Sequence, residues 1–73
     1  MNIGETLKKR IFELTIKYNK TFYELSKISG IPKSTIRKIA SGKSKNPNLA
    51  NIEKIAIAFG LSLYDFFDDE LFR

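Results

Sequence analysis

The 73-residue chain contains no cysteine, no histidine and no tryptophan. Without thiols it forms neither disulfides nor thiolate metal sites, and without imidazole it lacks the commonest general base and metal ligand. No apolar run approaches the ~18 residues that a membrane-spanning helix needs. These absences predict a protein with no metal or other cofactor, no membrane contact and no enzymatic activity.

The length of the chain limits it to one domain with one modest core. We therefore expect residues 1–73 to be a single unit that ends in a short acidic and apolar tail at 68–73. The segment from Met1 to Lys9 is polar and lacks the apolar centre of a signal peptide. A cytoplasmic location is expected on this ground.

Positive charge is concentrated in the first part of the chain. Residues 1–45 carry eleven Lys and Arg against three Glu, a net charge of +8, whereas residues 46–73 have a net charge of −3. Such asymmetry indicates that a polyanion faces the first part only, although charge of this kind also serves solubility.

Apolar residues recur at helical spacing along the whole chain, which predicts an all-α fold of five helices. The expected helices cover residues 3–18, 22–29, 33–40, 49–59 and 63–67. In the first helix the apolar stripe is Leu7, Ile11, Leu14 and Tyr18. The basic residues of this helix, Lys8, Lys9, Arg10 and Lys17 among them, lie largely off the stripe.

The second and third helices are the best signalled. Thr21 and Glu24 form a T-x-x-E capping box at the start of the second helix, where Leu25 and Ile28 are expected to point inward. Gly30 suits the left-handed residue that ends a helix, and Pro32 suits the first turn of the next one. Only about three residues separate the two helices, a spacing typical of the helix-turn-helix that binds DNA.

The third helix has two chemically different sides. At about 100° per residue, Ile36 and Ile39 fall on an apolar side and four polar residues fall on the other. The four candidate base-contacting residues are Lys33, Ser34, Arg37 and Lys38. An α-helix fits the major groove, where Lys and Arg pair with guanine O6 and N7. A solvated surface face is the alternative interpretation.

The residues after the third helix are small, polar and basic. Ser41, Lys43, Lys45 and Asn46 are of the types that contact phosphates and so position a protein on DNA. Thr21 is a further candidate for phosphate contact, because helix N-termini bind anions. The alternatives are a solvated loop and an ordinary helix cap.

With these elements placed, the chain resembles the Cro/repressor-type helix-turn-helix family of phage repressors and bacterial XRE-like regulators. The resemblance rests on TFYELSKISGIPKSTIRKIASG, residues 21–42, and on KSKNPNLANIEKIAIAFGLSLYDFF, which follows it. It implies a compact five-helix, lambda-repressor-like domain that binds double-stranded DNA. In the family pattern base contacts fall on Lys33, Ser34 and Lys38, with Arg37 beside them.

The resemblance also implies that Ser41, Lys43, Lys45 and Asn46 form the phosphate-contacting loop. Two positions depart from the family pattern. Phe22 stands where a glutamine often contacts the DNA backbone, so it either touches the sugar or a thymine methyl, or belongs to the core. Ser26 replaces the usual alanine and is expected to pack equally well.

The predicted function is a sequence-specific transcriptional regulator, a repressor that binds DNA as a homodimer. The end of the chain carries more apolar side chains than a short last helix can easily bury. The candidate dimer contacts are therefore Phe66, Phe67, Leu71 and Phe72. The same end favours an alternative function, a protein-interaction module such as an antitoxin that masks a protein partner. A Ser34–Lys38 dyad would suit an enzyme, but nothing in the sequence encloses it.

Overall fold

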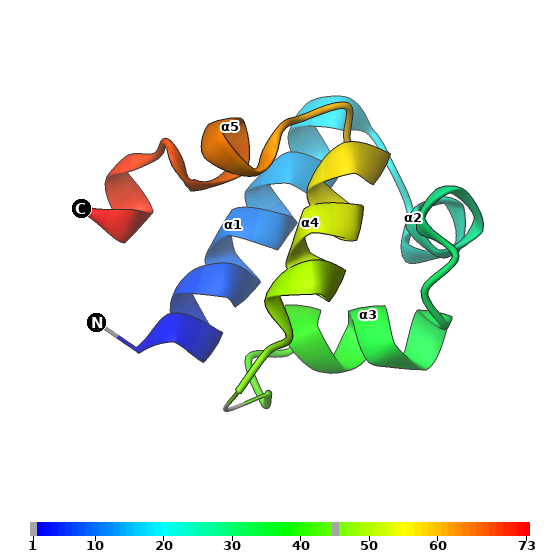
Figure 1. Cartoon of the computed structure of the whole chain (residues 1–73), viewed down its shortest axis with the longest axis horizontal. Helices are drawn as coiled ribbons and strands as arrows, with labels where there is room; N and C mark the ends of the chain where they lie inside the picture. Colours follow the sequence, from blue (N-terminus) through cyan, green and yellow to red (C-terminus); the bar gives the residue numbers. More distant parts are fainter. Residues whose placement is uncertain (1, 45) are drawn as a thin grey trace.

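The computed structural model describes residues 2–44 and 46–73 and builds them from helices joined by short turns (Figure 1). The α-helices in these residues are α1 (Ile3–Tyr18), α2 (Phe22–Ser29), α3 (Lys33–Ala40), α4 (Leu49–Ala58) and α5 (Leu63–Phe67), and the 3₁₀ helix η1 (Glu70–Phe72) follows. The predicted all-α fold class of five helices is confirmed. No helix in this part of the chain is long and apolar enough to cross a membrane.

Side-chain caps fix where the helices begin. The side chain of Asn2 accepts the N–H of Glu5 at 3.1 Å, and Ser62 accepts the N–H of Asp65 at 3.0 Å. Because each cap satisfies a backbone donor that has no partner within the helix, the sequence around it sets the first residue. Helix α4 ends one residue earlier than predicted, because Phe59 is its C-cap and Gly60 follows in the left-handed conformation with a φ of +84°.

One core joins all five α-helices, with α3 packed against α1 and α2, and α4 packed against α2 and α5. The buried apolar residues of the core are Leu7, Ile11, Leu14, Leu25, Ile31, Ile36, Ile39, Ile52, Ile55, Ala56, Ala58, Phe59 and Phe66. The prediction for Ile28 was wrong, because its side chain is 57% exposed. Ile28 is rotated by about 60° from the buried Leu25, which carries it past the contact of α2 with α3 and α4.

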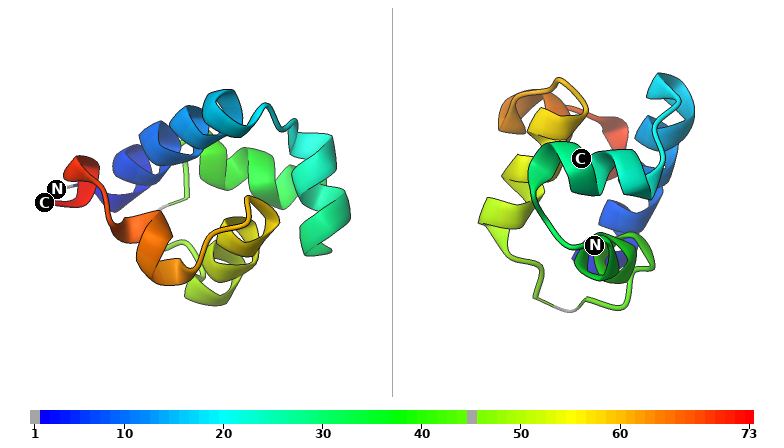
Figure 2. Two further views of the ribbon diagram at one scale, coloured as in Figure 1. Left: turned by 90° about the horizontal axis from the view of Figure 1, so that it is seen from above. Right: turned by 90° about the vertical axis from the view of Figure 1, so that its right-hand side faces the viewer.

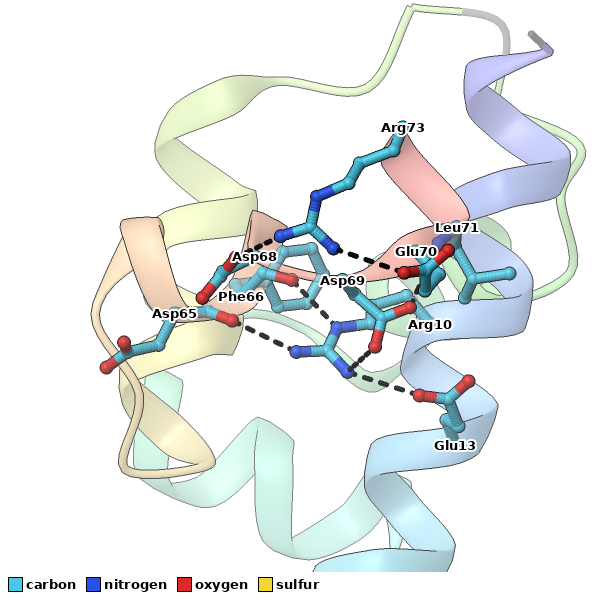
Figure 3. A network of polar contacts seen from close by, with 9 residues as sticks. All are labelled: Arg10, Glu13, Asp65, Phe66, Asp68, Asp69, Glu70, Leu71 and Arg73. Carbon is cyan, nitrogen blue, oxygen red and sulfur yellow. Dashed lines mark hydrogen bonds and ion pairs between the residues drawn. The ribbon is translucent and has the colours of Figure 1, made fainter.

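Arg10 is buried, although its position off the apolar stripe of α1 predicts exposure (Figure 3). Its guanidinium donates to the carbonyl oxygens of Phe66 at 2.7 Å and Asp65 at 3.0 Å. The same group pairs with Asp69 at 3.1 Å and with Glu13 at 3.2 Å. Arg10 therefore ties α1 to α5 and to the end of the chain.

The last residues fold back onto the protein. The ring of Phe72 lies 4.8 Å from that of Phe67 and 6.2 Å from that of Phe66 between centroids. The assignment of Phe66 to a dimer surface is corrected, because its side chain is fully buried in the core. Phe67, Leu71 and Phe72 are only partly buried.

The arrangement separates two sides of the molecule. In Figure 1, α3 and the loop that follows it lie along the lower edge, whereas α5 lies along the upper edge. The right-hand view of Figure 2 shows the same separation. The predicted DNA-binding helix is thus remote from α5.

Candidate nucleic-acid interface

The surface of α3 carries the predicted division into two sides. Ile36 and Ile39 are buried in the core, whereas Lys33, Ser34, Arg37 and Lys38 are all exposed. The structure therefore brings the four candidate base-contacting residues together on one exposed helical face. This cationic face is what an α-helix must present to the base edges of a major groove.

The turn before α3 is fixed by hydroxyl groups as well as by Gly30, whose φ is +76°. Ser26 donates its hydroxyl to the carbonyl oxygen of Ile31 at 2.6 Å. Ser29 accepts the N–H of Ile31 through its own hydroxyl at 3.1 Å. Ser26 thus does more than pack at the position of the family alanine, because its hydrogen bond helps to set the angle between α2 and α3. Pro32 is the N-cap of α3 and not its first helical residue.

The N-terminus of α2 is occupied by its own capping box. The N–H of Thr21 donates to the Glu24 carboxylate at 3.0 Å, and the N–H of Glu24 donates to the Thr21 hydroxyl at 3.1 Å. The pKa of the Glu24 carboxyl is lowered first by the N–H of Thr21 and then by the Thr21 hydroxyl, which also donates to the carboxylate at 3.2 Å, with a further lowering by the charge of Lys20. A phosphate at Thr21 would have to compete with this carboxylate.

Phe22 is partly buried and packs against the core, which favours the core interpretation of this residue. A glutamine at the same position would place an amide where the structure has an aromatic ring. The Phe22 side chain therefore cannot make the contact with the DNA backbone that a glutamine often makes at this position in the family pattern.

The loop after α3 presents the predicted phosphate-contacting residues that the structure describes. Ser41, Lys43 and Asn46 are exposed, and Lys45 lies outside the described residues. The hydroxyl of Ser41 donates to the carbonyl oxygen of Lys38 at 2.7 Å and accepts the N–H of Lys43 at 3.4 Å. Ser41 is therefore a cap for the end of α3 that also shapes the start of the loop.

A polar cleft of about 380 Å³ lies between α3 and the segment that leads into α4. Its lining residues are Ser34, Thr35, Lys38, Ile39, Ser44, Asn46, Pro47, Asn48 and Asn51. The sequence analysis did not identify Asn48 or Asn51 as part of this region. Asn48 accepts the N–H groups of Ala50 at 2.8 Å and Asn51 at 3.3 Å, so its place before an apolar run was a readable N-cap signal. Two amides thus join Lys38 at the edge of the cationic face.

Comparison with known proteins gives one match. The family model described as Helix-turn-helix (HTH_3) matches residues 12–66, from the middle of α1 into α5. The matched segment contains α2, the turn, α3 and the polar loop. No match was found among curated proteins or among solved structures.

Proposed function

The chain belongs to the Helix-turn-helix family of DNA-binding transcription regulators, and on this premise we propose that it is a repressor that recognises specific double-stranded sites. The match confirms the resemblance to the Cro/repressor-type, XRE-like family. The observation that carries the proposal is the exposed face of α3, where Lys33, Arg37 and Lys38 stand on one side of a helix whose other side is buried. Bound at a promoter in the cytoplasm, such a domain represses by occupying the DNA that the polymerase needs.

In the proposed complex, α3 lies in the major groove and the loop lies against the DNA backbone. Lys33, Ser34, Arg37 and Lys38 contact base edges, which is where sequence is distinguished. Ser41, Lys43 and Asn46 contact phosphates, which sets the position and orientation of α3 without selecting a sequence. The two sets meet at Ser41, whose hydroxyl donates to the carbonyl oxygen of Lys38 in α3 and accepts the N–H of Lys43 in the loop.

We further propose that two protomers bind one palindromic site. Two-fold dimers of this motif place their recognition helices about 34 Å apart, one turn of DNA. The partly buried Phe67, Leu71 and Phe72 remain candidate contacts, and Tyr64, 75% exposed, adds apolar surface next to Phe67. This surface belongs to α5 and η1, on the side of the molecule away from α3 (Figure 1).

Substitution of two lysines separates base contact from phosphate contact. In Lys38→Ala we expect a loss of roughly 1–3 kcal/mol at the preferred site and a relaxed preference at one base pair, because a donor to a base edge is lost. In Lys43→Ala we expect weaker binding to preferred and scrambled duplexes alike. Fluorescence anisotropy with both duplexes measures the two effects.

The two variants remove the same charge from neighbouring parts of the surface, so each is the control for the other. If both lowered affinity equally for preferred and scrambled DNA, the assignment of base contact to α3 would be wrong. If Lys43→Ala changed the base preference and Lys38→Ala did not, the roles of helix and loop would be reversed.

A further inference from the structure

Gly4 lies in the first turn of α1 and is buried against the loop that follows α3. A Cβ atom at this position would lie 2.9 Å from the carbonyl oxygen of Gly42 and 2.9 Å from that of Ser44. Both distances are shorter than van der Waals contact between carbon and oxygen. Only a residue without a side chain lets the two backbones approach this closely.

The close approach explains why Gly4 stands in a helix, where glycine is unfavourable. Glycine in a helix costs roughly 0.5–1 kcal/mol relative to alanine, and the capping and length of α1 do not require it. Helix α1 is held by Leu7 and Ile11, which are buried in the core. A side chain at position 4 would therefore displace the loop more easily than it would displace α1.

We propose that Gly4 is a positioning residue for DNA binding, because it fixes the position of the loop residues Ser41, Lys43 and Asn46 relative to α3. The inference rests on the proposed function of that loop. Gly4 itself touches no DNA in this account. The space left by the missing Cβ lets the carbonyl groups at 42 and 44 approach α1, which fixes the distance from α1 to the loop and so fixes which phosphates the loop reaches together with α3.

The variant Gly4→Ala tests the proposal in two independent ways. In the free protein, we expect ¹H–¹⁵N spectra to show shifted amides at residues 41–44, while those at residues 33–38 change little. With DNA, we expect affinity for preferred and scrambled duplexes to fall by the same factor, about tenfold, with the base preference unchanged.

Gly60→Ala is the matched control. Gly60 has a φ of +84° and open space where a Cβ would stand, so alanine there strains the backbone after α4 without touching the loop. Both variants are assayed well below their melting temperatures, which circular dichroism determines. We expect Gly60→Ala to melt earlier than the unsubstituted protein and to bind DNA as tightly.

If Gly4→Ala does not fold, insertion of one glycine between Gly42 and Lys43 loosens the same contact from the loop side, at a small entropic cost. The same uniform loss of affinity is expected from it. Unchanged loop amides together with unchanged affinity would overturn the role of Gly4. If the unsubstituted protein failed to bind any duplex, the proposed function would fall, whereas shifted loop amides in Gly4→Ala would still establish the seating of the loop.

Discussion

The affinity for double-stranded DNA is expected to fall steeply with salt. The described part of the interface carries four exposed cations, Lys33, Arg37, Lys38 and Lys43. In the proposed complex Lys33, Arg37 and Lys38 contact base edges and Lys43 neutralises a phosphate, which contributes about −0.9 per protomer to the slope of log K against log salt. With the phosphate contact that the sequence predicts for Lys45 added, the slope is about −1.8 per protomer. Between 50 and 200 mM salt a slope of about −1.8 gives a loss of about 12-fold for one protomer and about 150-fold for two on one palindrome.

Two lysine variants show whether the slope comes from this interface. Lys43→Ala should reduce the steepness by about 0.9, because one phosphate contact is lost. Lys54→Ala should leave the slope unchanged, since Lys54 is exposed on α4, on the side opposite its buried residues Ile52 and Ile55. Binding isotherms at four or five salt concentrations measure all three slopes. A nearly flat dependence for the unsubstituted protein would rule out an electrostatic interface.

The second large effect concerns stability and involves Arg10. Arg10→Ala should lower the free energy of unfolding by about 3 kcal/mol, because it leaves a buried carbonyl and a carboxylate without their cationic partner. The affected groups are the carbonyl oxygen of Phe66 and the carboxylate of Asp69. Urea unfolding followed by circular dichroism gives the value, which is a large fraction of the stability of a small domain.

The partners of Arg10 provide the controls. Glu13→Ala removes only a half-exposed carboxylate and should cost less than about 1 kcal/mol. Arg10→Lys keeps the charge but not the planar fork of donors, so an intermediate loss is expected. Where folded, these variants should still contact a single half-site through α3, since α5 and α3 lie on opposite sides of the molecule (Figure 1), whereas palindrome binding also depends on the α5 and η1 surface that Arg10 holds in place. Ordinary surface substitutions change the free energy of unfolding by up to about 0.5 kcal/mol. A smaller loss than this in Arg10→Ala would contradict the structural role of this network.

Local signals in the sequence were sufficient for the helices. The capping box at Thr21 and Glu24, the cap at Ser62 and the glycine at position 30 each act within a few residues, so the bounds of α2, α3 and α5 could be predicted. The exposed face of α3 was predictable for the same reason, because helical periodicity alone places Lys33 and Arg37 opposite Ile39.

Contacts between distant segments could not be obtained in this way. Arg10 stands about 40° from Leu14 on the helical wheel, at the edge of the apolar stripe, but nothing near it in the sequence indicates that the carbonyl groups of Asp65 and Phe66 will meet its basic side chain. The approach of Gly4 to the carbonyl of Ser44 is equally a product of tertiary packing. Phe66 is the opposite case, because the sequence predicts a contact with a partner and the structure buries its side chain in the core of the same chain.

Selection of bound fragments from a random double-stranded DNA library tests the central claim most directly. The account predicts enrichment of one motif with two inverted half-sites whose centres are about 10 base pairs apart, and a relaxed base preference at one position of each half-site when Lys38→Ala is used. A single asymmetric half-site would retain the base contacts by α3 but exclude the dimer. Recovery of unenriched sequences by a folded protein would contradict sequence-specific recognition by this helix.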